Sequence, residues 1–200
     1  MTIRALQLAL RTLAQTSRIF CSEADFQFAL AWELQKQMPQ AKIFLEHPVR
    51  INSKDCLIDI WIEEDGHIYP IELKYKTKGA IVAGMTLKNH SAVDFGCYDY
   101  LYDIYRIEQL KSSVSNFHKG WAIMLTNEPA YYKNTMRTSA YDDFKIFQNA
   151  VKCGQLTWGL TSKGTIFNCG NRNGFSLAGS YTMNWAHYGN SDFQFLISEI

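Results

Sequence analysis

The chain has 200 residues, of which 47% are hydrophobic and 20% are charged, and its formal net charge is +1. This composition is typical of a single globular domain, here 1–200, and argues against a largely disordered chain. Because the net charge is close to zero, nucleic-acid binding would have to depend on a local basic surface and not on bulk charge.

The cysteines, histidines and apolar segments argue against several other protein classes. The five cysteines include no C-x-x-C pair and the five histidines include no H-x-x-x-H pair, so we expect neither a disulfide framework nor a zinc site. Reduced thiols favour a cytoplasmic location. Arg4, Gln7 and Arg11 interrupt the N-terminal apolar run, and no apolar stretch reaches the roughly 20 residues that span a bilayer. We therefore expect no signal peptide and no membrane partner.

Two helices are predicted at the start of the chain. The first covers 2–15. The second begins after Ser22, whose hydroxyl is a good N-cap, and ends before Pro39.

Three strands follow, over 43–51, 56–62 and 68–76. Pro48 predicts that the first strand lies at a sheet edge or contains a bulge, because proline cannot donate to a ladder. The dipeptide Asp65-Gly66 between the other two is typical of a hairpin turn, so these strands should be antiparallel neighbours.

The second half of the chain predicts a loop over 77–96, a helix over 98–117 and a buried strand over 121–127. A weak helical tendency lies in 141–151, and the tail contains short strand-like pieces at 156–160, 164–168 and 193–197. The order of these elements predicts an α/β fold, with α+β as the alternative, in which helices flank one mixed central sheet.

Two carboxylates and one ammonium group are predicted to lie on one side of the hairpin. Side chains alternate across a strand, which places Ile58, Ile60 and Ile62 on one face and Asp59 on the other with Leu57 and Trp61. Glu72 and Lys74 stand two residues apart in the next strand and share a face. Antiparallel pairing then brings Asp59 beside Glu72.

This grouping points to metal-assisted chemistry. Charged groups inside apolar strands are costly unless they are paired or bound to metal, and adjacent carboxylates favour a cation between them. Mg²⁺ is usually held by one or two carboxylates together with water and substrate phosphate. Such an ion activates water and stabilises charge on the phosphate, and a lysine can orient or deprotonate that water. Asp59, Glu72 and Lys74 thus suit phosphodiester hydrolysis, whereas the alternative is a plain ion pair on a solvated face.

A family resemblance becomes visible here. The segment IDIWI (58–62) followed by DGHIYPIELKYK (65–76), after a capped helix that carries glutamate, resembles the core of the PD-(D/E)XK nuclease superfamily, which has the restriction-endonuclease-like fold. The likeness extends over 20–127 in element order and is most specific over 56–76. Ile58 stands where the family motif often has proline. Residues 130–200 align with no member and form a β-rich C-terminal elaboration of unknown role.

The resemblance implies that Asp59 and Glu72 bind Mg²⁺ or Mn²⁺ and that Lys74 assists the attacking water. The implied activity is cleavage of DNA, with RNA as the alternative substrate. Single-domain members often dimerise to cut both strands, so a homodimer is a candidate assembly. Many members add a glutamate from the first core helix, and this position is matched best by Glu23, ahead of Gln27 and Glu33.

Basic and polar side chains near the motif are candidates for phosphate contacts. Lys76 and Lys78 follow Lys74 in the sequence, and Lys88 could join them. A polar stripe at helical spacing in the helix over 98–117 consists of Asp99, Asp103, Arg106 and Gln109. Family members often place a polar residue of this helix near the site, which makes Arg106 and Gln109 candidates for phosphate contacts, but a solvated helix face is the preferred interpretation of the stripe.

Three other features have simpler interpretations. His47 is expected at a strand edge beside Pro48 and not as an accessory ligand. Trp61 is expected in the core. The GNRNG segment at 170–174 is expected to form a turn and not a phosphate cradle.

Two alternatives to a nuclease remain open. The fold could act as a nucleic-acid- or partner-binding module without catalysis, although loss of Lys74 or of a carboxylate would then be expected. The hairpin charges could also form a structural ion pair, which metal binding by Asp59 and Glu72 would rule out.

Overall fold

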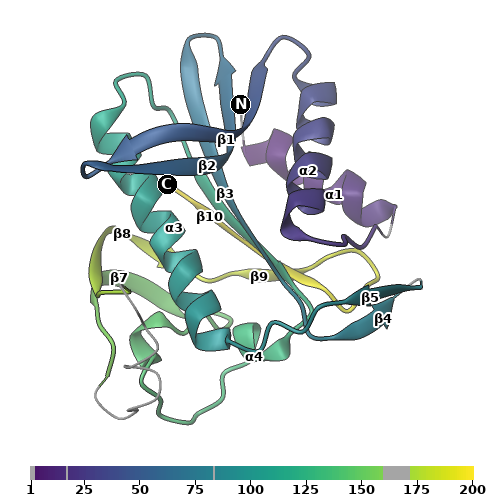
Figure 1. Ribbon diagram of the computed structural model, residues 1–200, viewed down its shortest axis with the longest axis vertical. Coiled ribbons are helices and arrows are strands. Elements are labelled where there is room, and N and C mark those ends of the chain that lie inside the picture. The colour runs from purple at the N-terminus through teal and green to yellow at the C-terminus, as the bar shows by residue number, and fades with distance from the viewer. Residues whose placement is uncertain (1–2, 17, 83, 160–171) are drawn as a thin grey trace.

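A six-stranded mixed sheet forms the centre of the protein (Figure 1). The computed structural model describes residues 3–16, 18–82, 84–159 and 172–200. In spatial order the strands are β1 (Lys42–Ile51), β2 (Lys54–Glu64), β3 (His67–Lys76), β6 (Trp121–Thr126), β10 (Gln194–Glu199) and β9 (Trp185–His187). β3 and β6 run parallel, and all other neighbours in this sheet are antiparallel. The mixed α/β class expected from the element order is thereby confirmed.

Helices cover both faces of this sheet (Figure 1). On one face lie α1 (Ile3–Gln15) and α2 (Glu23–Gln37), whose apolar residues form a core with Ile60, Ile71 and Leu73. On the other face lies the long helix α3 (Val93–Ser113), packed against Ala122 and Met124. Within the described part of the chain, no helix is long and apolar enough to cross a membrane.

The beginning of α2 matches the sequence prediction. The Ser22 hydroxyl accepts a hydrogen bond from the backbone N–H of Asp25 at 3.1 Å, which satisfies one of the free donors of the first turn. Glu23 therefore becomes the first helical residue. The helix ends at Gln37, before Pro39, as expected.

The hairpin of β2 and β3 is also confirmed. Asp65 and Gly66 have φ values of 51° and 77°, and such positive values at both central residues characterise the tight turn that asparagine, aspartate and glycine favour. The register pairs Ile60 with Ile71. β1, which contains Pro48, is one of the two edge strands of the sheet, as predicted.

The structure differs from the predicted loop over 77–96 in two places. Two three-residue strands, β4 (Ala80–Val82) and β5 (Met85–Leu87), form a small hairpin there. α3 then begins at Val93, five residues before the predicted start, and its N-cap Ala92 makes no side-chain hydrogen bond. Strands of three residues are too short to show periodicity, and an uncapped helix start carries no sequence signal.

The end of α3 and the following polar segment also differ from the prediction. α3 stops at Ser113 and not at 117, and Val114 is extended. The weak helical tendency over 141–151 yields only a 3₁₀ turn at Asp142–Phe144, while a short helix, α4, covers Pro129–Tyr132. The strand-like piece 156–160 is described as far as residue 159, and of these four residues only Leu156 is in a strand, β7 (Val151–Leu156).

The C-terminal segment is joined closely to the rest of the protein. β7 pairs with β8 (Phe175–Thr182) beside α3, whereas β9 and β10 extend the central sheet. The predicted strand at 193–197 lies largely within β10, and the predicted piece 164–168 lies outside the described residues. The segment 130–200 thus supplies part of the sheet itself.

Candidate active site

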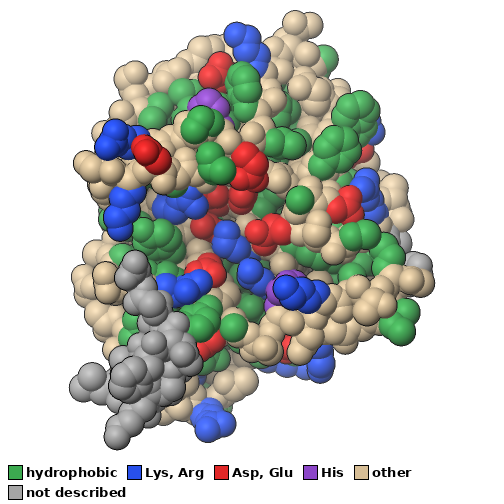
Figure 2. Space-filling model, viewed as in Figure 1, with side chains coloured by type: hydrophobic (Ala, Val, Ile, Leu, Met, Phe, Trp, Pro, Cys, Tyr) green, Lys and Arg blue, Asp and Glu red, His purple; other side chains and the backbone are tan. Residues whose placement is uncertain are grey.

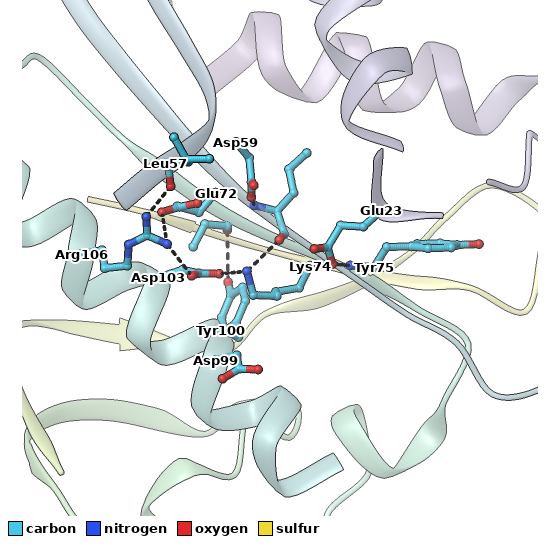
Figure 3. A network of polar contacts seen from close by, with 12 residues as sticks. Glu23, Leu57, Asp59, Glu72, Lys74, Tyr75, Asp99, Tyr100, Asp103 and Arg106 are labelled. Atoms are coloured by element: carbon cyan, nitrogen blue, oxygen red, sulfur yellow. Dashed lines mark hydrogen bonds and ion pairs between the residues drawn. The ribbon is translucent and has the colours of Figure 1, made fainter. Parts of the chain in front are cut away.

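Charged side chains from β2, β3, α2 and α3 converge on one region beside the sheet (Figure 3). Glu72 and Lys74 share a face of β3, as predicted, and this face is covered by α3. Ile71, Leu73 and Tyr75 take the opposite face and enter the core below α1 and α2. The apolar alternation of β3 therefore turns both charged groups toward α3.

Asp59 stands where β2 separates from β3. The recorded pairing of the two strands ends at Ile60, and the Asp59 carboxylate then accepts a hydrogen bond from the backbone N–H of Leu73 at 2.5 Å. The prediction that Ile58 shares a face with Ile60 is wrong, because Ile58 packs in a separate cluster with Trp61. This break in alternation at Asp59 brings its carboxylate to the backbone of β3.

Glu72 is almost fully buried, with 1% of its surface exposed. Its Oε1 lies 2.9 Å from a guanidinium nitrogen of Arg106 on α3. Arg106 also donates to the backbone carbonyl of Leu57 on β2. The distance makes Glu72 and Arg106 an ion pair, yet Glu72 Oε1 accepts no hydrogen bond of good geometry from the described residues.

Lys74 makes its ion pair with Asp103 of α3 and not with the motif carboxylates. The distance between Lys74 Nζ and Asp103 Oδ2 is 2.6 Å, and the ammonium also donates to the backbone carbonyl of Leu73 at 2.9 Å. Only 3% of Asp103 is exposed. The alternative of a plain ion pair on a solvated face is therefore wrong, because the pair that Lys74 forms is buried between sheet and helix.

The polar stripe of α3 does not form a solvated face as a whole. Its two middle members, Asp103 and Arg106, point into the site. Asp99 lies one turn away and pairs with Arg172 at 3.0 Å. Gln109 lies at the other end, where its carboxamide oxygen is 3.5 Å from the side-chain amide of Asn52. Of the two predicted phosphate contacts on this helix, Arg106 alone reaches the buried carboxylates.

The three residues of α2 that were candidates for the site occupy different places. The Glu23 carboxylate accepts a hydrogen bond from the backbone N–H of Tyr75 at 2.7 Å, at the end of β3 beyond Lys74. Gln27, the lesser alternative, donates to the backbone carbonyl of Asp59 at 2.5 Å and to Glu46 at 2.8 Å. Glu33 instead pairs with Lys36 within the same helix. Glu23 is thus the α2 glutamate at the site, and Gln27 supports the backbone of Asp59.

Burial and crowding of like charges shift the acid–base properties of the site. Burial raises the pKa of Glu72 well above its usual value, and Asp103 adds to the effect while Arg106 opposes it. Burial likewise raises the pKa of Asp59, against the lowering influence of Lys74. The pKa of Lys74 is raised, since the surrounding carboxylates, led by Asp103, outweigh the effect of its burial. The raised pKa values mean that Glu72 and Asp59 take up a proton more readily than exposed carboxylic acids do, whereas Lys74 remains charged.

Asp103 should leave a signature in the pH dependence of stability. Burial raises its pKa from 3.8 to about 6, with Lys74 opposing the rise. Between these values the folded protein holds a proton that the unfolded chain has released, so the free energy of unfolding falls as pH rises. We expect a steeper fall between about pH 4 and about pH 6 in wild type than in Asp103→Asn. Urea unfolding at several pH values measures both slopes, and equal slopes would contradict the assignment.

The residues present suit a divalent cation. Around Lys74 stand four carboxylates, of Asp103, Asp59, Glu23 and Glu72, against two cations, Lys74 and Arg106, so full ionisation leaves an excess of two negative charges. A hard cation near Asp59 and Glu72 would balance this charge and give buried Glu72 Oε1 a partner. No group of three or more His, Cys, Asp or Glu among the described residues is arranged to hold a metal. Two carboxylates with water and phosphate are the usual surroundings of Mg²⁺.

The surface around the site carries both signs of charge. Acidic side chains gather at the centre of the face in Figure 2, with basic side chains beside and below them. Lys76 is half-buried and Lys78 is exposed at the end of β3. His90 accepts a hydrogen bond from the backbone N–H of Thr77 at 3.0 Å, and burial, Lys76 and Lys88 lower its pKa. The basic residues predicted from sequence therefore lie beyond the Lys74 end of the motif strand.

The residues that sequence analysis undervalued are Asp103, Gln27 and His90. Asp103 was recognised as part of a helical stripe, but the direction of that stripe depends on how α3 packs on the sheet. His90 showed no signal, because its partner Thr77 is bound only once the β4–β5 hairpin folds back. His47 and Trp61 behave as expected: their rings stack 4.5 Å apart between the edge strand and β2, and Trp61 is buried. Of the predicted turn at 170–174, residues 172–174 are described and form no helix or strand.

Comparison of the chain with known proteins and structures identified no relative. No protein-family model matches the chain, and searches of curated proteins and of solved structures found no match.

Proposed function

We propose that the protein is a metal-dependent nuclease of the PD-(D/E)XK type, with a restriction-endonuclease-like core. In this proposal Asp59 and Glu72 hold Mg²⁺ or Mn²⁺, Lys74 assists the attacking water, and Glu23 completes the site. The substrate is DNA, with RNA as the alternative.

The observation that carries the proposal is the convergence of Asp59, Glu72 and Lys74 beside one another at a break in the sheet, with the carboxylate charge in excess. Glu72 and Lys74 both act on the pKa of Asp59, so the three charged groups lie close enough to interact. A buried carboxylate pair is costly, and it is maintained most readily where a cation is to be bound. The same three residues are those that the family resemblance selects.

Each group of the site would have its own role in the proposed hydrolysis of a phosphodiester. A bound divalent cation supplies polarisation of a phosphate oxygen and a water of lowered pKa. Asp59, fixed by the Leu73 N–H, and Glu72 provide oxygen ligands. Lys74 keeps its proton and offers a positive charge and N–H donors to the phosphate or the water as negative charge develops. Glu23, fixed by the Tyr75 N–H, keeps a further carboxylate near the ammonium.

The test compares wild type with Glu72→Gln, using as the matched control Glu33→Gln, whose carboxylate pairs with Lys36 within α2 and away from the site. Each protein is titrated with Mn²⁺ in a calorimeter and incubated with linear, circular and single-stranded DNA and with RNA. We expect wild type and Glu33→Gln to bind Mn²⁺ and to cleave at least one substrate until EDTA is added, whereas Glu72→Gln does neither. A wild-type protein that neither binds Mn²⁺ nor cleaves overturns the proposal, and equal cleavage by Glu72→Gln places the activity elsewhere.

One observation favours a second candidate function, a nucleic-acid- or partner-binding module without catalysis. Arg106 already pairs with Glu72, and Lys74 with Asp103, so the buried charges are partly satisfied without a cation. This candidate predicts binding of oligonucleotides in EDTA that Mn²⁺ leaves unchanged. The calorimetric titration above separates it from the nuclease.

Lys76 and Lys78 are expected to guide the phosphate backbone to the site. Removal of a lysine that contacts phosphate lowers the slope of log affinity against log salt by about one. We therefore expect Lys76→Ala and Lys78→Ala each to reduce this slope, measured by fluorescence anisotropy of a labelled oligonucleotide. The exposed Lys111, at the distant end of α3, supplies the control Lys111→Ala. Slopes equal to wild type in both test variants would remove these lysines from the binding surface.

A further inference from the structure

Asp103 is a buried carboxylate that lies outside the sequence motif but inside the charged network. It projects from α3, only 3% of it is exposed, and its Oδ2 lies 2.6 Å from Lys74 Nζ. Its Oδ1 lies 3.8 Å from Arg106 on the same helix. A buried ionised carboxylate is costly unless it is well paired, and replacement of such pairs by apolar residues is often neutral for stability. Stability by itself therefore gives no strong reason for aspartate at this position.

The position of the Lys74 ammonium depends on this contact. An ammonium group has three N–H donors on a flexible four-carbon chain. One side of it is held by the carbonyl of Leu73 at 2.9 Å and another by Asp103. The Asp103 contact is an ion pair, and Asp103 Oδ2 accepts no hydrogen bond of good geometry from the described residues, so the N–H groups that Leu73 does not engage remain for a water or a phosphate. The contacts are drawn in Figure 3.

Without Asp103 the ammonium would have other carboxylates within reach. Among the charges that raise its pKa, Asp103 ranks first, followed by Asp59, Glu23 and Glu72. A lysine released from α3 would turn to these three remaining carboxylates, and two of them, Asp59 and Glu72, are the proposed metal ligands. Those carboxylates would then be occupied by an ammonium group and less available to a cation.

We propose that Asp103 is a positioning residue, which holds the Lys74 ammonium on the α3 side of the site, facing the reacting phosphate and clear of Asp59 and Glu72. The inference rests on the proposed function, since it takes Asp59 and Glu72 as the ligands of a divalent cation. It goes beyond that function by assigning α3 a role in keeping the metal position open.

A double-mutant cycle of Asp103→Asn and Lys74→Met tests this, with Mn²⁺ affinity measured by calorimetry. Asp103→Asn should weaken Mn²⁺ binding at least about tenfold when Lys74 is present and less than about threefold in the Lys74→Met background, a coupling of the size seen for contacting residues. Asp99→Asn is the matched control, because Asp99 lies one turn away on α3 and pairs outside the network. It should stay within about twofold of wild type.

Two further measurements guard against a merely structural effect. Circular dichroism and urea unfolding establish that each variant is folded, and Asp103→Glu, which keeps the charge, should recover most of the Mn²⁺ affinity even if Asp103→Asn is unstable. On a cleaved oligonucleotide, Asp103→Asn should lower kcat by about 10- to 100-fold and leave KM within about twofold.

The outcomes separate the two levels of the proposal. Wild type that binds Mn²⁺, together with an equal loss of affinity from Asp103→Asn in both Lys74 backgrounds, overturns the positioning role and shows that Asp103 acts on the metal directly. Unchanged affinity in Asp103→Asn overturns it as well. Wild type that binds no Mn²⁺ overturns the nuclease proposal, and the positioning role falls with it.

Discussion

A Lys74→Met variant is expected to lose about 10³-fold in kcat on any nucleic acid that the wild type cleaves, while it binds Mn²⁺ at least as tightly. The loss follows because, in the part of the chain that the structure describes, the other cation of the buried network, Arg106, is held on Glu72 and on the Leu57 carbonyl. The Mn²⁺ affinity is retained because the substitution removes a positive charge beside the carboxylates. Single-turnover cleavage and calorimetric titration measure the two quantities.

The matched control for this variant is Lys76→Met, two residues further along the same strand. It should alter substrate affinity and leave the rate of the bound complex within about threefold of wild type. Cleavage by Lys74→Met at the wild-type rate would remove Lys74 from the chemistry. A parallel loss of Mn²⁺ binding would instead mean that the variant has disturbed the site.

Of the proposed variants, Arg106→Met is expected to lose the most stability. Its free energy of unfolding should fall by about 3–5 kcal/mol at neutral pH without divalent cations. The physical reason is that Glu72, with 1% exposure, would lose the guanidinium that lies 2.9 Å away and would have to stay charged without a partner or take up a proton from solvent, and both are costly. Urea unfolding measures the loss. Adding Glu72→Gln should recover a large part of it, because the buried carboxyl group that lacks a partner is then gone.

The control for Arg106→Met is Arg50→Met, which breaks an exposed ion pair with Asp55 at 3.8 Å. This change should cost less than about 1 kcal/mol, because solvent screens exposed pairs. Mn²⁺ should also stabilise Arg106→Met more than wild type if the cation takes over the neutralisation of Glu72. An equal loss in the presence and absence of Glu72→Gln would show that Arg106 stabilises the fold through the Leu57 carbonyl instead.

The local elements of the motif were predictable because their causes are local. The Ser22 cap, the Asp65-Gly66 turn and the edge position of Pro48 each depend on the conformational preference of one or two residues. The alternation of apolar and charged residues in β3 then placed Glu72 and Lys74 together on one face. These features are confirmed by the structure.

The break at Asp59 could not be predicted, because it depends on contacts from two other elements. The apolar pattern of β2 is regular, yet Ile58 and Ile60 enter different cores. Gln27 from α2 donates to the backbone carbonyl of Asp59, and the Asp59 carboxylate accepts a hydrogen bond from the Leu73 N–H of β3. A strand pattern carries no information about either partner, so the regular alternation was expected to continue.

The sequence by itself determined the helix cap, the hairpin and the placement of Glu72 and Lys74 on one face of a strand, because each follows from residues close along the chain. Only the tertiary structure decided which partners those charges have. Asp103 and Arg106 are separated from the motif by about 30 residues, and they reach Lys74 and Glu72 because α3 packs across β3. Ion pairs between distant segments depend on how helices lie on a sheet. The hydrophobic packing of whole elements sets this arrangement, and no local sequence pattern encodes it.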